Sequence, residues 1–261
     1  MAKKTGDKII RELTAAIALP LTALPDKVLS MLALNIIGKK AKSLPPEESL
    51  RFLLELDNKL YGMQGSQSVR YGGGLHTKHR HTNYHQFFIE QVAPDSTIID
   101  LGCGNGALSH DIATKHPGTS IIGIDLNPKN IAKAKERFAS KNITYLCGDI
   151  LDDKTLPPQD FDTIILSNVL EHLPGRAGFL KAIQKKLNPR QILIRVPLFE
   201  RDWRVPLKKE LGIEWRLDAT HETEYTLESW EEELKNAGLE VAHQEIRWGE
   251  IWAKTTSISS K

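Results

Sequence analysis

A glycine-rich stretch at residues 98–106, with the sequence IIDLGCGNG, constrains this chain more than any other feature. The β-branched pair Ile98–Ile99 is typical of the end of a buried strand, and three glycines at alternate positions predict a tight turn. Residues 107–115 then follow a helical pattern. A strand, a glycine turn and a helix N-terminus together indicate the start of a nucleotide-binding βαβ unit. Asp100 lies at the mouth of this turn, where its carboxylate is placed to accept a hydrogen bond from a ligand.

From residue 97 onward, short apolar runs alternate with helical patterns, as expected for a parallel sheet covered on both faces. The predicted strands are residues 97–101, 120–124, 143–147, 161–167 and 191–196, and the predicted helices among them are residues 107–115, 128–140 and 176–187. A helix at 227–237 and two strands at 239–246 and 250–255 predict an antiparallel hairpin that closes the sheet. The fold class is therefore α/β, a doubly wound and mostly parallel sheet.

The first 70 residues predict a separate α-helical appendage, with helices at 7–19, 25–40 and 45–60. The apolar runs at 13–25 and 28–38 are shorter than the roughly 18–20 residues that span a bilayer, so we expect no transmembrane span. A helical hairpin packed on the rest of the chain is the favoured interpretation, and peripheral membrane attachment is the alternative. Residues 71–261 are expected to form the nucleotide-binding domain.

The overall charge bears on whether the chain binds nucleic acid, and the number of cysteines bears on the cellular compartment in which it works. The chain has 35 basic and 33 acidic residues, a net charge of +2, which gives no electrostatic case for a nucleic-acid surface. The two cysteines, Cys103 and Cys147, make no disulfide framework, so a reducing, cytoplasmic location is predicted. The oligomeric state stays open.

Two segments outside the regular pattern are candidates for substrate binding. Residues 71–85 form a flap in which a glycine-rich loop precedes basic and aromatic residues, and His79, Arg80 and Tyr84 are its candidate contacts to an anionic group. A solvated loop is an equally good interpretation, and no nearby cysteine or clear carboxylate completes a metal site with the flap's histidines. Residues 198–226 form an irregular lid, where Trp203 and Trp215 either stack on a ring of the substrate or anchor the lid.

Acidic residues at successive strand ends narrow the choice of cofactor. Asp125 ends the second strand, beside the expected ribose, and Asp149 follows the third, where it can reach an adenine edge. A nicotinamide dinucleotide favours the pattern G-x-G-x-x-G, whereas here the glycines are Gly102, Gly104 and Gly106, preceded by an acid. An acid at that entrance suits a ligand with an ammonium group and no pyrophosphate, and S-adenosylmethionine has both properties.

The chain resembles the class I S-adenosylmethionine-dependent methyltransferases over about residues 86–255. The matching stretches are 98–106 (IIDLGCGNG), 123–126 (GIDL), 148–150 (GDI) and 161–173 (FDTIILSNVLEHL). The resemblance implies a seven-stranded sheet with an antiparallel last strand and S-adenosylmethionine as the cofactor. It also implies the cofactor-binding residues, which are Asp100, Gly102, Cys103, Gly104, Asp125, Leu126, Asp149, Ile150, Ser167 and Asn168.

The same resemblance points to a small-molecule acceptor. The tripeptide Leu170–Glu171–His172 is common in the branch that acts on small molecules. In some quinone-precursor O-methyltransferases a similar stretch helps to bind a divalent metal, but with an extra acid where this chain has Asn168, so we expect no metal. Sequence motifs of the nucleic-acid methylating enzymes are missing from the chain, and we expect no nucleic-acid partner.

The predicted reaction is methyl transfer to a hydroxyl of a small molecule, sugar-like or a secondary metabolite. Such an acceptor benefits from a general base, and His172 and His221 are the candidate catalytic residues. For each of them a structural role is as good an interpretation. The alternatives are an N- or C-methyltransferase, a non-catalytic subunit or sensor that binds S-adenosylmethionine and, outside this family, a nicotinamide dehydrogenase.

Overall fold

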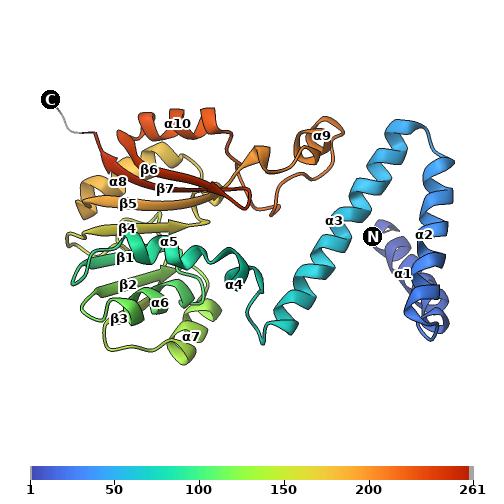
Figure 1. Cartoon of the computed structure of the whole chain (residues 1–261), viewed down its shortest axis with the longest axis horizontal. Coiled ribbons are helices and arrows are strands. Elements are labelled where there is room, and N and C mark those ends of the chain that lie inside the picture. The colour runs from blue at the N-terminus through green and yellow to red at the C-terminus, as the bar shows by residue number, and fades with distance from the viewer. Residues whose placement is uncertain (1, 259–261) are drawn as a thin grey trace. The chain divides into compact units, whose positions relative to one another are not determined.

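The structure, a computed structural model, describes residues 2–258, with side chains from residue 8 onward. The chain divides into two compact units, Met1–Gly62 and Met63–Lys261, and each is described by itself. Figure 1 shows the first unit as helices only, and the second as a sheet with helices on both faces.

The first unit contains α1 (Ala2–Leu21), α2 (Asp26–Lys42) and the first part of α3 (Pro46–Tyr71). All three helices were predicted, but the predicted end of the third at residue 60 was wrong, because α3 continues through Gly62 and Gly65 to Tyr71. A glycine costs a helix only about 1 kcal/mol, so two of them weaken α3 without ending it. Within residues 2–258, no helix is long and apolar enough to cross a membrane.

The second unit is built on one sheet with the strand order β3-β2-β1-β4-β5-β7-β6. The strands are β1 (Thr97–Leu101), β2 (Ser120–Asp125), β3 (Ile143–Cys147), β4 (Thr163–Ser167), β5 (Gln191–Pro197), β6 (Leu239–Arg247) and β7 (Glu250–Ser257). The strands from β3 to β5 pair in parallel, and β7 pairs antiparallel with both β5 and β6. The predicted seven-stranded, mostly parallel sheet is therefore confirmed.

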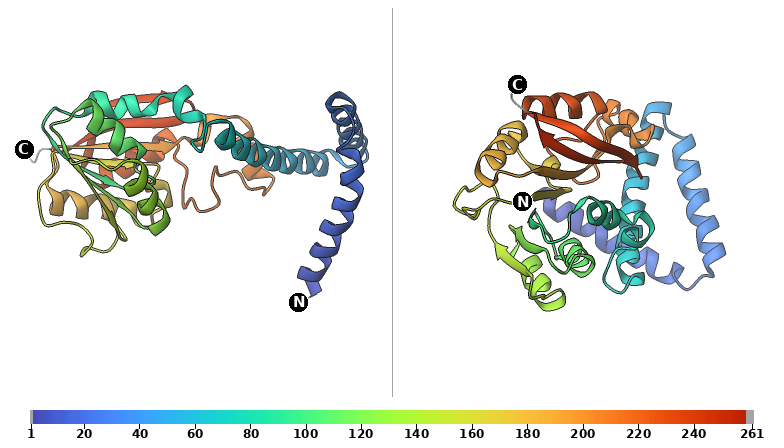
Figure 2. Two further views of the ribbon diagram at one scale, coloured as in Figure 1. Left: turned by 90° about the horizontal axis from the view of Figure 1, so that it is seen from below. Right: turned by 60° about the vertical axis from the view of Figure 1, so that its left-hand side comes forward.

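Helices cover both faces of this sheet. The helices α5 (Tyr84–Gln91), α6 (Ala107–Lys115) and α7 (Pro128–Arg137) lie on one face, and α8 (Arg176–Leu187) and α10 (Leu227–Asn236) lie on the other. Figure 2 shows α5 and α8 on opposite sides of the strands. The alternation along β4 explains both cores, because Ile164 and Leu166 pack in one cluster and Ile165 packs in the other.

The remaining short helices lie in the two segments predicted to be irregular. The flap contains α4 (Lys78–Thr82), and the segment after β5 contains η2 (Phe199–Arg201) and α9 (Arg204–Glu210). A fourth short helix, η1 (Leu170–His172), lies outside these segments and follows β4. The end of the lid lies beside the residue that follows β5, because the buried Tyr225 forms an isolated parallel β-bridge with Leu198. All the acids singled out from the sequence lie at the carboxyl ends of β1, β2 and β3, at one edge of the parallel sheet.

Candidate active site

The glycine turn between β1 and α6 holds its shape through backbone hydrogen bonds to the neighbouring strand. The amides of Gly102 and Cys103 donate to the carbonyl oxygen of Ile124, at 2.7 and 2.9 Å. Gly102 has a φ of 77°, and a Cβ there would lie 2.5 Å from a methyl carbon of Val169. Only glycine therefore combines this backbone conformation with such close packing.

A cavity of about 520 Å³ opens beside this turn, across the ends of β2, β3 and β4. Its lining brings together six of the predicted cofactor contacts, which are Gly102, Asp125, Leu126, Asp149, Ile150 and Asn168. Leu126, which is 69% exposed, gives this part of the lining an apolar surface on which a flat ring could lie. The Asp125 carboxylate is held in place by the amides of Gly104 and Asn127, each at 2.9 Å.

A second cavity, of about 200 Å³, lies on the other side of Gly102. It is lined by the remaining predicted cofactor contacts (Asp100, Cys103, Gly104, Ser167), by His79 and Tyr84 of the flap, and by Arg195 of β5. Burial raises the pKa of Asp100 to about 6, although Ser109 donates a hydrogen bond to it at 2.5 Å. Burial also raises the pKa of the Cys103 thiol, which therefore stays protonated at neutral pH.

The second cavity has an acid at one end and a cation at the other. Arg195 is buried, its guanidinium lies 3.6 Å from the ring centroid of Tyr84, and its Nε donates to Asn168 Oδ1 at 2.6 Å. Burial, followed by the charges of His85 and Lys78, lowers the pKa of His79 to about 4, so His79 is neutral at pH 7. A carboxylate and a guanidinium facing one cavity suit a zwitterion, with an ammonium group near Asp100 and a carboxylate near Arg195.

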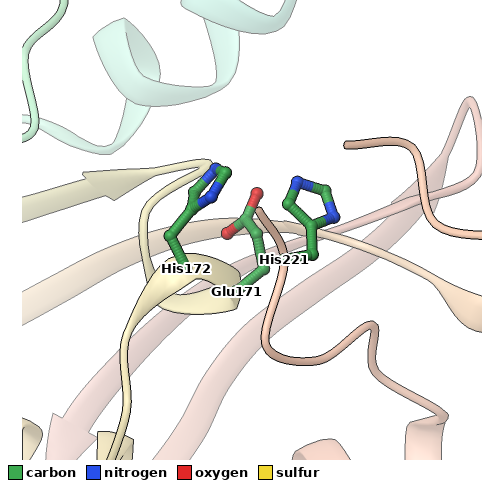
Figure 3. A group of neighbouring side chains, drawn as sticks. All are labelled: Glu171, His172 and His221. Carbon is green, nitrogen blue, oxygen red and sulfur yellow. The ribbon is translucent and has the colours of Figure 1, made fainter. Parts of the chain in front are cut away.

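Glu171, His172 and His221 form a cluster at the edge of the larger cavity (Figure 3). Glu171 and His172 come from η1, and His221 comes from the lid, so the cluster joins two segments about 50 residues apart. The two imidazole rings meet edge to face with centroids 4.6 Å apart. Glu171 is fully buried, and its Oε2 atom has no hydrogen-bond partner among the described residues.

Hydrogen bonds define which nitrogen of each histidine is free. His221 Nδ1 lies 3.0 Å from Glu224 Oε1, so an Nδ1–H donates to that carboxylate. His172 Nδ1 lies 3.0 Å from the hydroxyl of Thr220, whose own proton goes to Asp218 Oδ1 at 2.8 Å. Both rings therefore donate through Nδ1, which leaves Nε2 as the ring nitrogen that can exchange a proton with a ligand. Burial and the charge of His221 lower the pKa of His172, which favours this neutral form.

The cluster also has the composition of a cation site. Its three members each offer one ligand atom, and these atoms lie within 4.8 Å of one another. One carboxylate and two imidazoles suit zinc and the later divalent transition metals more than magnesium or calcium. The sequence-based expectation of no metal stays a prediction.

Three of the predicted substrate contacts lie outside the two cavities. Arg80 is exposed, with its guanidinium 5.3 Å from the ring centroid of Tyr71. Trp203 is 73% exposed, and Trp215 packs edge to face on Phe199 at 5.2 Å. The lid's contribution to the site is instead His221.

Two functional candidates, Glu171 and Arg195, were missed from the sequence. Arg195 carries a visible signal, because it is the one charged residue in the apolar strand QILIRVP. A charge in such a strand is either paired or faces a ligand. Glu171 was noted only as part of the tripeptide 170–172, because its complete burial and its unpaired oxygen depend on packing that the sequence does not show.

The comparisons with known proteins agree with this geometry. A family model for a methyltransferase domain matches residues 93–252. The chain belongs to this methyltransferase family. The predicted class, fold and enzyme type are thereby confirmed, and so is the cofactor, since S-adenosylmethionine is the methyl donor of these enzymes.

Individual relatives are more distant than the family match. A 2-methyl-6-phytyl-1,4-hydroquinone methyltransferase of Synechocystis is 25% identical over 159 residues, covering 58% of this chain and 48% of the relative. A ubiquinone biosynthesis O-methyltransferase of Serratia proteamaculans is 27% identical over 97 residues, covering 36% of this chain and 39% of the relative. The match thus spans less than half the length of either relative.

Among solved structures, a small RNA methyltransferase, HEN1, superposes with a TM-score of 0.55 and 20% identity. The superposition covers 69% of this chain and 25% of HEN1. At that identity the likeness shows a shared fold and no shared substrate.

Proposed function

We propose that this methyltransferase transfers the methyl group of S-adenosylmethionine to a hydroxyl of a small molecule. The observation that carries the proposal is a pair of histidines, each hydrogen-bonded through Nδ1, that lie beside the buried and incompletely hydrogen-bonded side chain of Glu171. The relative named as a ubiquinone biosynthesis O-methyltransferase supports a hydroxyl acceptor, and the relative named for a hydroquinone supports a small-molecule substrate.

In this proposal the two cavities divide the cofactor between them. Asp100 and Arg195 hold the amino-acid tail in the smaller cavity, while Asp125 and Asp149 bind the ribose and adenine in the larger one. The sulfonium supplies an activated methyl group, so the residues of the chain have only to position the acceptor, exclude water and remove a proton. His221 accepts the acceptor's proton at Nε2, and Glu224 stabilises the resulting imidazolium through Nδ1.

We keep the domain boundaries predicted from the sequence, 1–70 and 71–261, because the flap and the lid that supply residues to the site both fall within the second domain. The flap, residues 71–85, supplies His79 and Tyr84 to the smaller cavity. The lid, residues 198–226, supplies His221 to the cluster. Arg80, Trp203 and Trp215 remain candidate acceptor contacts, which the lining of the two cavities does not include.

The test is transfer of an isotopically labelled methyl group from S-adenosylmethionine into a small-molecule extract of the source organism, followed by product identification. We expect an ether-linked methyl group in the product. Replacing His221→Gln should lower turnover by a factor on the order of 100 or more, because a glutamine cannot accept the proton. Affinity for S-adenosylhomocysteine, measured by calorimetry, should stay unchanged. His243→Gln, an exposed histidine on β6, is the matched control and should retain full turnover.

Other outcomes identify the alternatives. A methylated nitrogen or carbon in the product would replace the hydroxyl acceptor, and label recovered in added RNA would overturn the small-molecule class. Cofactor binding without any labelled product would indicate a binding subunit or sensor. Turnover that a chelator abolishes and zinc restores would move the proton-removing role from His221 to a metal held by the cluster.

A further inference from the structure

The helices of the first unit expose most of their apolar side chains. Of the described side chains in residues 8–62, only that of Leu54 is buried. Exposed apolar residues include Ile9, Ile10, Leu13 and Ile17 on α1, and Val28, Met31, Leu32, Leu34 and Ile36 on α2. Soluble proteins rarely leave such a concentration of apolar surface in water, so these helices need an apolar surface to cover them.

The pattern on α1 is that of a helix lying at an interface. Ile10, Leu13 and Ile17 recur at helical spacing and are 60%, 60% and 66% exposed. Lys8, Arg11 and Glu12 lie toward the other side of the helix, by the same spacing of about 100° per residue, and Lys8 Nζ lies 3.8 Å from Glu12 Oε1. A helix with one apolar side and one charged side, too polar to span, is suited to lie in the plane of a membrane surface.

The charge of this segment favours a lipid surface over a second copy of the chain. Residues 1–42 contain eight Lys or Arg and three Asp or Glu, a net charge of +5, whereas the whole chain has +2, which leaves −3 for residues 43–261. Two copies meeting through this segment would bring two positive surfaces together. An anionic membrane instead attracts each basic residue near its surface by about 1 kcal/mol.

The last turn of α2 adds to this arrangement. Lys39, Lys40 and Lys42 close a helix whose exposed apolar residues lie on every side. Lysine side chains at the end of an apolar helix extend toward phosphate groups while the helix body stays among the acyl chains. We propose that α1 and α2 bind the surface of an anionic lipid bilayer, with their apolar side chains inserted and their lysines among the headgroups.

The experiment is vesicle flotation with the full chain. Vesicles of phosphatidylcholine alone are compared with vesicles that also contain phosphatidylglycerol. We expect binding to the anionic vesicles to exceed binding to the neutral ones at least tenfold, and to weaken as salt is raised and shortens the screening length.

A pair of double variants tests which side of α1 inserts. Leu13→Ser with Ile17→Ser should weaken binding to the anionic vesicles at least tenfold, because it removes two large apolar side chains whose burial among the acyl chains favours binding. Ala15→Ser with Ala18→Ser places the same two residues elsewhere on the helix and should leave binding nearly unchanged. Binding of S-adenosylhomocysteine by both variants checks that the second unit stays folded.

Three outcomes would overturn the proposal. The first is no binding to anionic vesicles. The second is equal loss of binding, or none, in both double variants. The third is a dimer by light scattering that Leu13→Ser with Ile17→Ser converts to monomers, which would assign the apolar surface to a second copy of the chain. Each is independent of the proposed reaction, because none of the measurements uses methyl transfer.

Discussion

The substitution Glu171→Gln should make the free energy of unfolding fall less as the pH is raised, because ionisation of the Glu171 carboxyl destabilises the folded state. The side chain is fully buried, and burial raises its pKa to about 7 from 4.5, against the opposing effect of the hydrogen bond from Asn168. The folded state therefore binds this proton more tightly than the unfolded chain does. Below pH 4.5, Glu171 is protonated in both states and does not change the free energy of unfolding. As the pH rises from 4.5 to 7, the free energy of unfolding falls, and above pH 7 it is lower by an amount set by the difference between the two pKa values.

The magnitude follows from the two pKa values. A difference of 7 − 4.5 at about 1.36 kcal/mol per unit gives about 3 kcal/mol. For a domain of this size, that corresponds to a change of roughly 6–12 °C in melting temperature. A glutamine does not ionise, so the melting temperature of Glu171→Gln relative to the parent protein should rise by this amount between pH 4.5 and pH 8.

The assay is thermal unfolding of both proteins at pH 4.5, 5.5, 6.5 and 8, followed by circular dichroism. Other titrating groups, including Asp100 with its raised pKa, are present in both proteins and cancel in the difference. Glu90→Gln, an exposed glutamate on α5, is the control and should give a difference that does not vary with pH. A constant difference between Glu171→Gln and the parent protein would refute the reasoning, because it would mean that Glu171 ionises as easily in the folded state as in the unfolded one.

Two further predictions concern the glycine turn and its surroundings. Gly102→Ala should weaken binding of S-adenosylhomocysteine at least tenfold by calorimetry, since the new Cβ would lie 2.5 Å from Val169. Gly104→Ala, at a φ of 57° but with no atom within 4 Å of the new Cβ, should weaken binding less. Equal losses in the two variants would contradict the role of the contact with Val169. Ser109→Ala removes the hydrogen bond to Asp100 and should lower the free energy of unfolding at pH 7 by about 1–3 kcal/mol in urea titrations, and by less at pH 4, where Asp100 is protonated and the lost hydrogen bond is a neutral one. An equal loss at both pH values would exclude the charge on Asp100 as the cause.

The sheet could be predicted from the sequence because its signals are local. The strands at Thr97–Leu101 and Ile143–Cys147 and the helices at Ala107–Lys115 and Arg176–Leu187 have the predicted bounds. In each case an apolar run ends at a glycine, a proline or a polar turn. Because the carboxyl ends of parallel strands meet at one edge of a sheet, the meeting of Asp100, Asp125 and Asp149 at that edge follows from the topology.

Two members of the cluster, His172 and His221, were candidates from the sequence, but their meeting at Glu171 could not be predicted in the same way. His221 reaches it only because Arg201 and the amide of Leu217 both bind Glu224, which fixes the lid around His221. These contacts join residues far apart in an irregular segment, where neither period nor turn chemistry indicates which side chain points inward. The continuation of α3 past Gly62 was also missed, because the low helix propensity of a glycine is outweighed by the other residues of a long helix.

Asn168 links the two cavities, and its amide explains why this chain has no acid there. Its Oδ1 accepts from Arg195 Nε at 2.6 Å, and its Nδ2 donates to Glu171 Oε1 at 2.7 Å. An aspartate at position 168 would keep the contact with Arg195. However, it would place a second carboxylate next to Glu171 and leave Oε1 of Glu171 without a hydrogen-bond donor. The amide therefore satisfies one oxygen of Glu171 and leaves Oε2 as the unpaired atom of the cluster. Because Arg195 lines the smaller cavity, we expect a carboxylate bound there to compete with Asn168 for the guanidinium, which would link ligand binding to the contact between Asn168 and Glu171.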